Sequence, residues 1–110
     1  MQDGRAETLD RIDQLEKMLA AEPGDTFVLY SLGHEYAKAD KHEAAVEHYQ
    51  KCLEADPGEH YAYFHMARSL EAMGEQARAA EVLKAGLERA RGDGNEKASG
   101  EIAQYLSQLG

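Results

Sequence analysis

The chain has 110 residues, a formal net charge of −9 and a single cysteine. A surface this acidic repels polyanions, so neither nucleic acid nor an anionic membrane surface is expected as a partner. No apolar run approaches the roughly 18 residues that a membrane-spanning helix needs, and the start does not resemble a secretory signal. Because Cys52 alone cannot form an internal disulfide, we predict a reducing, cytoplasmic location.

The first predicted element is a helix over residues 6–21. Its apolar residues recur at helical spacing, at Leu9, Ile12, Leu15, Met18 and Leu19. The helix ends at Pro23-Gly24, because proline cannot continue a helix and glycine lets the chain reverse. By its position this is the second helix of a pair whose first helix is absent.

Residues 26–59 and 60–93 each predict a pair of helices joined by a short turn. The acidic Pro-Gly turn at 22–25 recurs 34 residues later at 56–59, and a fixed period of this size is typical of a helical solenoid. The first helices carry matching apolar stripes, Leu29, Leu32, Gly33 and Tyr36 in one and Tyr63, Met66, Ala67 and Leu70 in the other. Further stripes follow in the second helices, at Ala45, Tyr49, Cys52 and Leu53 and at Ala79, Leu83, Gly86 and Leu87.

Two kinds of small residue have a mechanical role in this pattern. Asp40 and Gly74 lie between the helices of each pair, where a left-handed residue allows a sharp turn. Gly33, Cys52 and Gly86 are expected where neighbouring helices approach closely, since larger side chains would force the helices apart.

The last predicted element is a closing helix over residues 95–109. Its apolar residues are Ala98, Ile102, Tyr105, Leu106 and Leu109, and its outer face is more polar. The preceding turn, at residues 91–93, lacks a proline, so the helix before it is expected to run longer. Together the elements predict a single all-α domain of about five antiparallel helices.

These residues resemble the tetratricopeptide repeat (TPR) family, whose 34-residue unit has a large residue, Leu-Gly and Tyr in its first helix. The first pair supplies Leu29, Leu32-Gly33, Tyr36, Ala45, Tyr49, Cys52 and Pro57 for this signature and that of the second helix. The resemblance implies a right-handed α-α superhelix. It divides the chain into a half-repeat helix (6–21), two TPR units (26–59 and 60–93) and a capping helix (95–109), as in small bacterial-type stand-alone members.

The resemblance also implies a function, because the first helices of such units line a concave groove that binds partners. Carrying the groove positions onto this chain gives a predicted peptide-binding set of Phe27, Tyr30, His34, Lys38, Tyr61, Phe64, His65 and Arg68. Aromatic residues and arginine are common anchors at recognition surfaces. The expected ligand is an extended peptide segment with apolar side chains and a carboxylate.

Three alternatives remain beside this interpretation. Glu71, one turn after Arg68, could pair with the guanidinium and neutralise it. Phe27, Tyr61 and Phe64 could instead pack against flanking helices. The open ends of the solenoid could also support structural self-association as a homodimer.

Other functions have weaker support in the sequence. Tyr30, His34 and His65 stand where chaperone-binding members use Lys, Asn and Asn, so binding of a chaperone tail is not expected. The segment HEAAVEH lacks the second histidine of a zinc-protease helix, and no phosphate loop or nucleophile–base pair appears. We therefore expect a protein-interaction module or scaffold, with no catalytic residues, no metal and no cofactor.

Overall fold

The computed structural model describes residues 4–109, and this part of the chain contains helices and no strand. The helices are α1 (Gly4–Ala21), α2 (Thr26–Lys38), α3 (His42–Ala55), α4 (His60–Ala72), α5 (Gln76–Gly92) and α6 (Glu96–Leu109). The all-α prediction is confirmed. The predicted count of about five helices is wrong, because each repeat forms two helices and each flank adds one, which makes six across the described residues.

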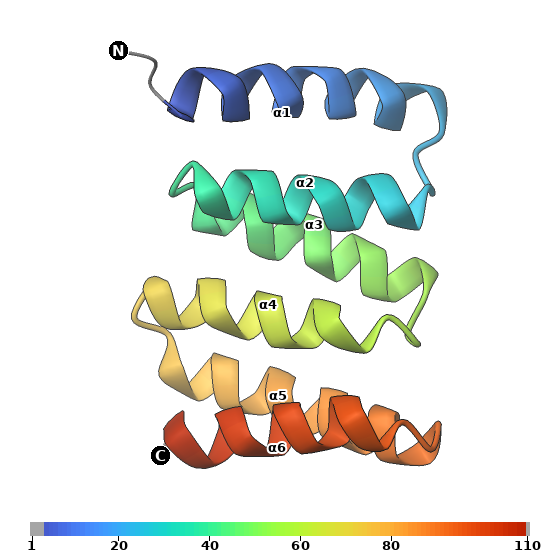
Figure 1. The fold of residues 1–110 in the computed structure, drawn as a ribbon, viewed down its shortest axis with the longest axis vertical. Coiled ribbons are helices and arrows are strands. Elements are labelled where there is room, and N and C mark those ends of the chain that lie inside the picture. Colours follow the sequence, from blue (N-terminus) through green and yellow to red (C-terminus); the bar gives the residue numbers. More distant parts are fainter. Residues whose placement is uncertain (1–3, 110) are drawn as a thin grey trace.

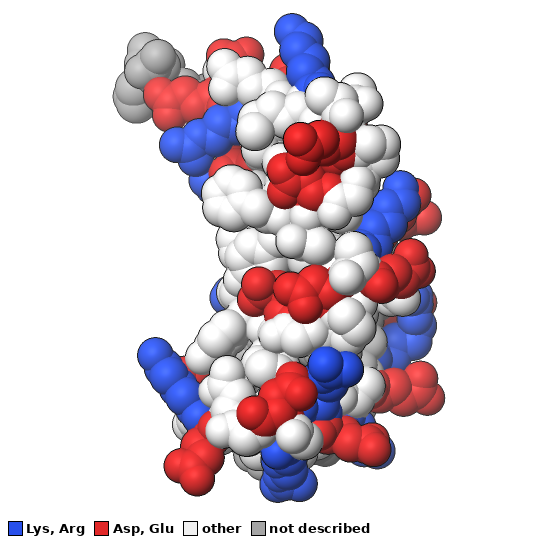
Figure 2. Space-filling model, turned by 90° about the vertical axis from the view of Figure 1, so that its right-hand side faces the viewer, with Lys and Arg blue, Asp and Glu red and all other residues white. Residues whose placement is uncertain are grey.

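The helices stack in chain order along the long axis of the molecule (Figure 1). Each helix packs against the next, and α2 also contacts α4, as α4 contacts α6. Helices α2, α4 and α6 run in the same direction and lie in front of α3 and α5 in Figure 1. Seen in profile, the stack is hollowed on one side (Figure 2).

The turns within and after the repeats follow one design. Asp40, Gly74 and Gly94 have φ angles of 60°, 80° and 72°, which confirms the left-handed turns predicted at the first two. After Asp40, the N–H of Lys41 donates to the Tyr36 carbonyl at 2.9 Å. The N–H of Glu75 donates to the Leu70 carbonyl at the same distance. Bonds of this kind satisfy carbonyls that a helix end otherwise leaves unpaired.

The turn after α5 lacks the proline of the earlier turns, as the sequence indicated. Helix α5 has 17 residues, whereas α3 has 14, so the prediction of a longer helix is confirmed. The side chain of Asn95 then accepts a hydrogen bond from the Ala98 N–H at 3.0 Å and starts α6, as an N-cap residue does.

Small residues let the two helices of each repeat approach closely. A Cβ atom added to Gly33 would lie 2.5 Å from a ring atom of Tyr49. One added to Gly86 would lie 2.6 Å from the Cβ of Tyr63. Cys52 is fully buried, and its thiol contacts the carbonyl of Thr26 at 3.7 Å. The expected close approaches at Gly33, Cys52 and Gly86 are confirmed.

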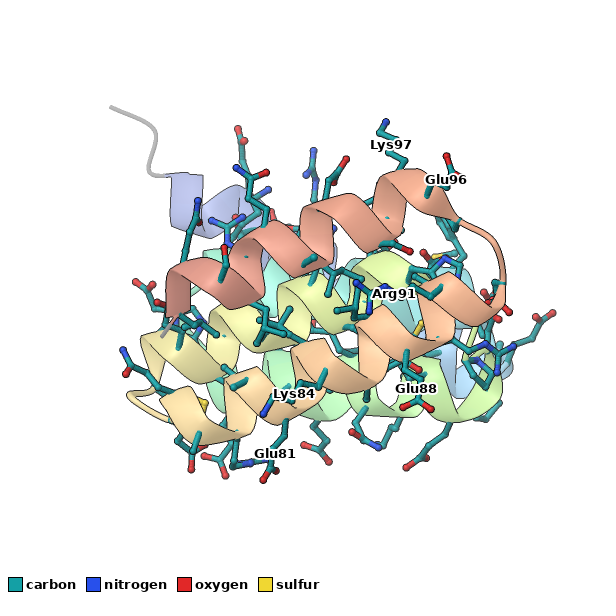
Figure 3. All side chains as sticks on the ribbon, turned by 90° about the horizontal axis from the view of Figure 1, so that it is seen from below. Glu81, Lys84, Glu88, Arg91, Glu96 and Lys97 are labelled. Atoms are coloured by element: carbon teal, nitrogen blue, oxygen red, sulfur yellow. The ribbon has the colours of Figure 1, made fainter. Side chains whose placement is uncertain are left out.

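Charged side chains follow the exposed side of α5. Figure 3 shows Glu81, Lys84, Glu88 and Arg91 spaced along α5 on the outside of the molecule, and all four are exposed. No helix of residues 4–109 combines the length and apolar character needed to cross a membrane.

Candidate peptide-binding groove

The hollow side of the molecule is formed by α2, α4 and α6 and is seen edge-on at the left of Figure 2. We call the surface between α2 and α4 the groove; ring contacts and a shared pocket bring six of the eight predicted residues together there, namely Tyr30, His34, Lys38, Phe64, His65 and Arg68. Phe27 is 71% exposed, and Lys38 and Arg68 are exposed. The other predicted residues, Tyr30, His34, Tyr61, Phe64 and His65, are half-buried.

Four rings meet where α2 and α4 pack together. The ring centroids of His34 and His65 lie 4.5 Å apart, at 83° to each other. Tyr30 lies 4.5 Å from His34 and 6.1 Å from His65. Phe64 extends this cluster, with its centroid 5.5 Å from that of His65. Because both helices contribute rings, the cluster spans the two repeats.

The two phenylalanines of the predicted set differ in how they pack. Phe64 also packs edge-on against Tyr105 of α6, with centroids 5.0 Å apart. Phe64 therefore packs partly against a flanking helix, as one of the alternatives from the sequence stated. Phe27 is largely exposed and does not pack in this way.

Sequence reasoning missed the contribution of Tyr49, which it assigned to a packing stripe. The ring of Tyr49 is fully buried in α3, yet its hydroxyl hydrogen-bonds to Nδ1 of His34. The ring also stacks on His65 at 6.2 Å and 23°. Gly33 was the available signal, since the missing side chain on α2 leaves room for the ring.

Burial keeps the groove imidazoles uncharged at neutral pH. Loss of solvent lowers the pKa of His65 to about 4, and the neighbouring His34 and Arg68 contribute in the same direction. Burial also lowers the pKa of His34. Burial raises the pKa of Tyr49, so its phenol keeps its proton and can donate a hydrogen bond to His34. At pH 7 the positive charge of the groove comes from Lys38 and Arg68 alone.

The two cations differ in how they are held. Lys38 Nζ lies 3.4 Å from Oε2 of the buried Glu35, whose Oε1 accepts a hydrogen bond from Arg11 of α1 at 3.2 Å. Arg68 makes no ion pair or hydrogen bond with another residue of the described chain. The hydroxyl of Tyr105 donates to Oε1 of Glu71 at 2.6 Å. The alternative in which Glu71 pairs with Arg68 is therefore not formed in the described structure.

The two groove histidines, His34 and His65, lie close together. Within residues 4–109, no three His, Cys, Asp or Glu side chains lie close enough together to hold a metal ion. The pair formed by His34 and His65 thus lacks the further ligands that a zinc or copper site requires.

Comparisons with known proteins agree with this architecture. The family model for the tetratricopeptide repeat matches residues 27–59. A TPR repeat-containing protein of Pseudomonas aeruginosa is 33% identical over 98 residues, which cover 89% of this chain and 93% of that protein.

Solved structures with the same fold include the following two proteins. The TPR2B domain of yeast Sti1, solved as a complex with pHsp70, has a TM-score of 0.85 at 23% identity, covering 96% of this chain and 85% of that one. Protein BPP2914 of Bordetella parapertussis has a TM-score of 0.77 at 28% identity, covering 89% and 85%. Together with the identity to the Pseudomonas protein, the matching repeat shows that the chain belongs to the tetratricopeptide repeat family.

Proposed function

We propose that the protein is an interaction module that binds a peptide segment of a partner protein in the groove. The observation that carries the proposal is the ring cluster of Tyr30, His34 and His65 beside Arg68, which has no ion-pair partner in the described chain. Accessible aromatic rings and arginine provide large contact areas and directed hydrogen bonds. The Sti1 domain, which shares the fold, was solved with a protein partner, and this supports the same general role here.

The groove has two chemically different ends. Phe27 and Tyr61 lie at the starts of α2 and α4. Because the two helices run in the same direction, both residues are at the same end. Lys38 lies at the end of α2, and Arg68 lies in the last two turns of α4. At about 1.5 Å per residue, Phe27 and Lys38 are about 16 Å apart along the helix, a distance that about five extended residues span. The proposed ligand has apolar side chains at one end and an anionic group at the other.

Selection from a peptide display library tests this proposal and does not require an identified partner. We expect enriched peptides that combine apolar and acidic residues at this spacing. The double variant Tyr30→Ala/Arg68→Glu should weaken their binding at least about tenfold, while circular dichroism stays unchanged. The matched control Arg91→Glu changes an exposed arginine of α5 (Figure 3) and should bind as the wild type does. Equal binding by the groove variant and the control would contradict the proposal.

Self-association through α1 is a less favoured candidate. Leu9 and Met18 of α1 are 47% and 51% exposed. They are nine residues apart, which places them on opposite sides of a helix at about 100° per residue. They therefore do not form one apolar patch, and sedimentation equilibrium should show a monomer.

A further inference from the structure

A pocket of about 330 Å³ lies at the Lys38 end of the groove, between the ends of α2 and α4 and the start of α3. Its polar lining side chains are Lys38, His42, Tyr49, His65, Arg68 and Ser69. Each of these side chains bears a nitrogen or oxygen that can carry a hydrogen, and the hydroxyl of Tyr49 already hydrogen-bonds to His34. No Asp or Glu belongs to the described lining, although the whole chain carries a net charge of −9.

Neither cation of the pocket has an acidic partner of its own among the described residues. Glu35 interacts with both Lys38 and Arg11, so one negative charge is shared between two cations. Glu71 accepts a hydrogen bond from Tyr105 of α6 and forms no ion pair with Arg68 in the described structure. Arg68 is thus left with its full hydrogen-bonding capacity for a ligand.

Three other polar side chains of the pocket, Ser69, His42 and Tyr49, are held in place by contacts with their neighbours. Ser69 is 2% exposed, and its Oγ lies 3.2 Å from Nδ1 of His42. The other ring nitrogen of His42, Nε2, lies 3.8 Å from Asp40 Oδ1. Tyr49 is fixed by the packed ring cluster. The pocket is therefore formed in advance by side chains from three helices.

We infer that this pocket is a subsite for a doubly charged oxyanion, the phosphoryl group of a phosphorylated residue in the bound peptide. A phosphate monoester carries close to two negative charges at neutral pH and three acceptor oxygens. Two cations on neighbouring helices, Lys38 and Arg68, match this charge, and arginine holds such oxygens with paired hydrogen bonds. A carboxylate brings one charge and two oxygens, so it uses the pocket less fully. The inference rests on the proposed function, because it assigns a ligand to one end of the same groove.

Titration of the ¹⁵N-labelled protein with methyl phosphate at pH 7.5 tests the subsite by itself. We expect saturable shifts in the backbone amides of residues 38, 42, 65, 68 and 69, with about tenfold weaker binding of acetate at equal ionic strength. Arg68→Gln and Lys38→Gln should each weaken methyl phosphate binding about tenfold. The matched controls Arg91→Gln and Lys84→Gln remove the same charges from the outer face of α5 (Figure 3) and should leave the affinity unchanged.

A second arm compares a display-selected peptide with its phosphoserine counterpart, in which the acidic residue at the Lys38 end is replaced. The phosphorylated peptide should bind about tenfold more tightly, and Arg68→Gln should remove this gain. The inference is overturned if acetate equals methyl phosphate, or if the two pocket variants bind methyl phosphate as the controls do. Peptides that bind the groove with no gain from phosphorylation overturn the subsite and leave the proposed function standing. Specific methyl phosphate binding without any peptide binding supports the subsite and contradicts the proposed function.

Discussion

Both repeats pack a tyrosine ring of one helix against a glycine of the other, but the two repeats place the tyrosine and the glycine on opposite helices. In the first repeat, Gly33 on α2 faces the ring of Tyr49 on α3. In the second, the ring belongs to Tyr63 on the first helix, α4, and the glycine is Gly86 on the second helix, α5. Each repeat thus brings its two helices together through one missing side chain and one tyrosine.

The exchange sends the two rings to different surfaces. The hydroxyl of Tyr49 hydrogen-bonds to His34 in the groove. Tyr63 lines a different pocket, together with Leu53 and Val82, and its hydroxyl donates to the Pro57 carbonyl at 3.4 Å. The tyrosine of the first repeat therefore contributes to the groove, whereas the tyrosine of the second repeat has only a structural role.

Gly86→Ala should give the largest loss of stability, because it breaks the purely structural contact. The new Cβ would meet Cβ and Cγ of Tyr63 at 2.6 and 2.7 Å, and these atoms lie too near the backbone to rotate away. We expect a decrease of about 2 kcal/mol in the free energy of unfolding, measured with urea. Peptide affinity should be unchanged at temperatures where the variant is folded.

Gly100→Ala is the matched control for this substitution. Gly100 is exposed in α6, and an added Cβ there would have no neighbour within 4 Å. Alanine is the better helix former, so the free energy of unfolding should rise by about 0.5–1 kcal/mol. Equal effects of the two substitutions would show that helix approach is not what Gly86 provides.

Gly33→Ala should sharpen the comparison, because it perturbs the groove as well as the packing. The new Cβ would meet ring atoms of Tyr49 at 2.5–2.7 Å. We expect a loss of about 1 kcal/mol in the free energy of unfolding and shifted imidazole resonances of His34 and His65. Peptide affinity should also fall, in contrast to Gly86→Ala.

The double variant Gly33→Ala/Tyr49→Leu copies the combination of Ala67 and Leu83 in the second repeat. Its loss in the free energy of unfolding should be smaller than the sum of the losses of the two single variants by about 1 kcal/mol, because leucine leaves space for the new methyl group. Additive effects in this double-mutant cycle would contradict the direct contact.

The pH dependence of stability should report on the groove side of the comparison. The pKa of His65 is lowered to about 4 from an ordinary value of 6.5, so the unfolded chain binds a proton that the folded protein excludes. Stability should therefore fall as the pH decreases from 6.5 towards 4. His65→Gln should remove this contribution, so the difference between wild type and variant should change through that window. A difference that is constant with pH would show that His65 titrates normally in the folded protein.

Tyr105→Phe should have the smallest effect, acting through the second repeat's Glu71. Without the phenol hydroxyl, Glu71 is free to pair with Arg68 one turn earlier. We expect methyl phosphate binding to weaken about two- to threefold, with a stability change of about 0.5–1 kcal/mol. Combining Tyr105→Phe with Glu71→Gln should restore the affinity if this explanation holds.

The backbone was largely predictable from the sequence, because periodic apolar stripes and turn residues are local signals. Asp40 and Gly74 adopt the expected left-handed turns, and the glycines mark the close approaches. The groove was less predictable, since its chemistry depends on contacts between helices. Glu71 is paired by Tyr105, 34 residues later in the sequence.

Tyr49 illustrates the same limit from the other direction. Its place in an apolar stripe indicated a core residue, and its ring is fully buried. Only the distance between α2 and α3 brings its hydroxyl to His34. Likewise, Glu35 reaches Arg11 only because α1 packs against α2.

The most direct test of the central claim is a set of intermolecular NOEs between the labelled protein and a display-selected peptide. If the groove is the recognition surface, the apolar side chains of the peptide should contact the rings of Tyr30, Tyr61 and Phe64. The anionic end should then lie beside Arg68. Contacts confined to the outer faces of α3 and α5, or to α1, would contradict the claim.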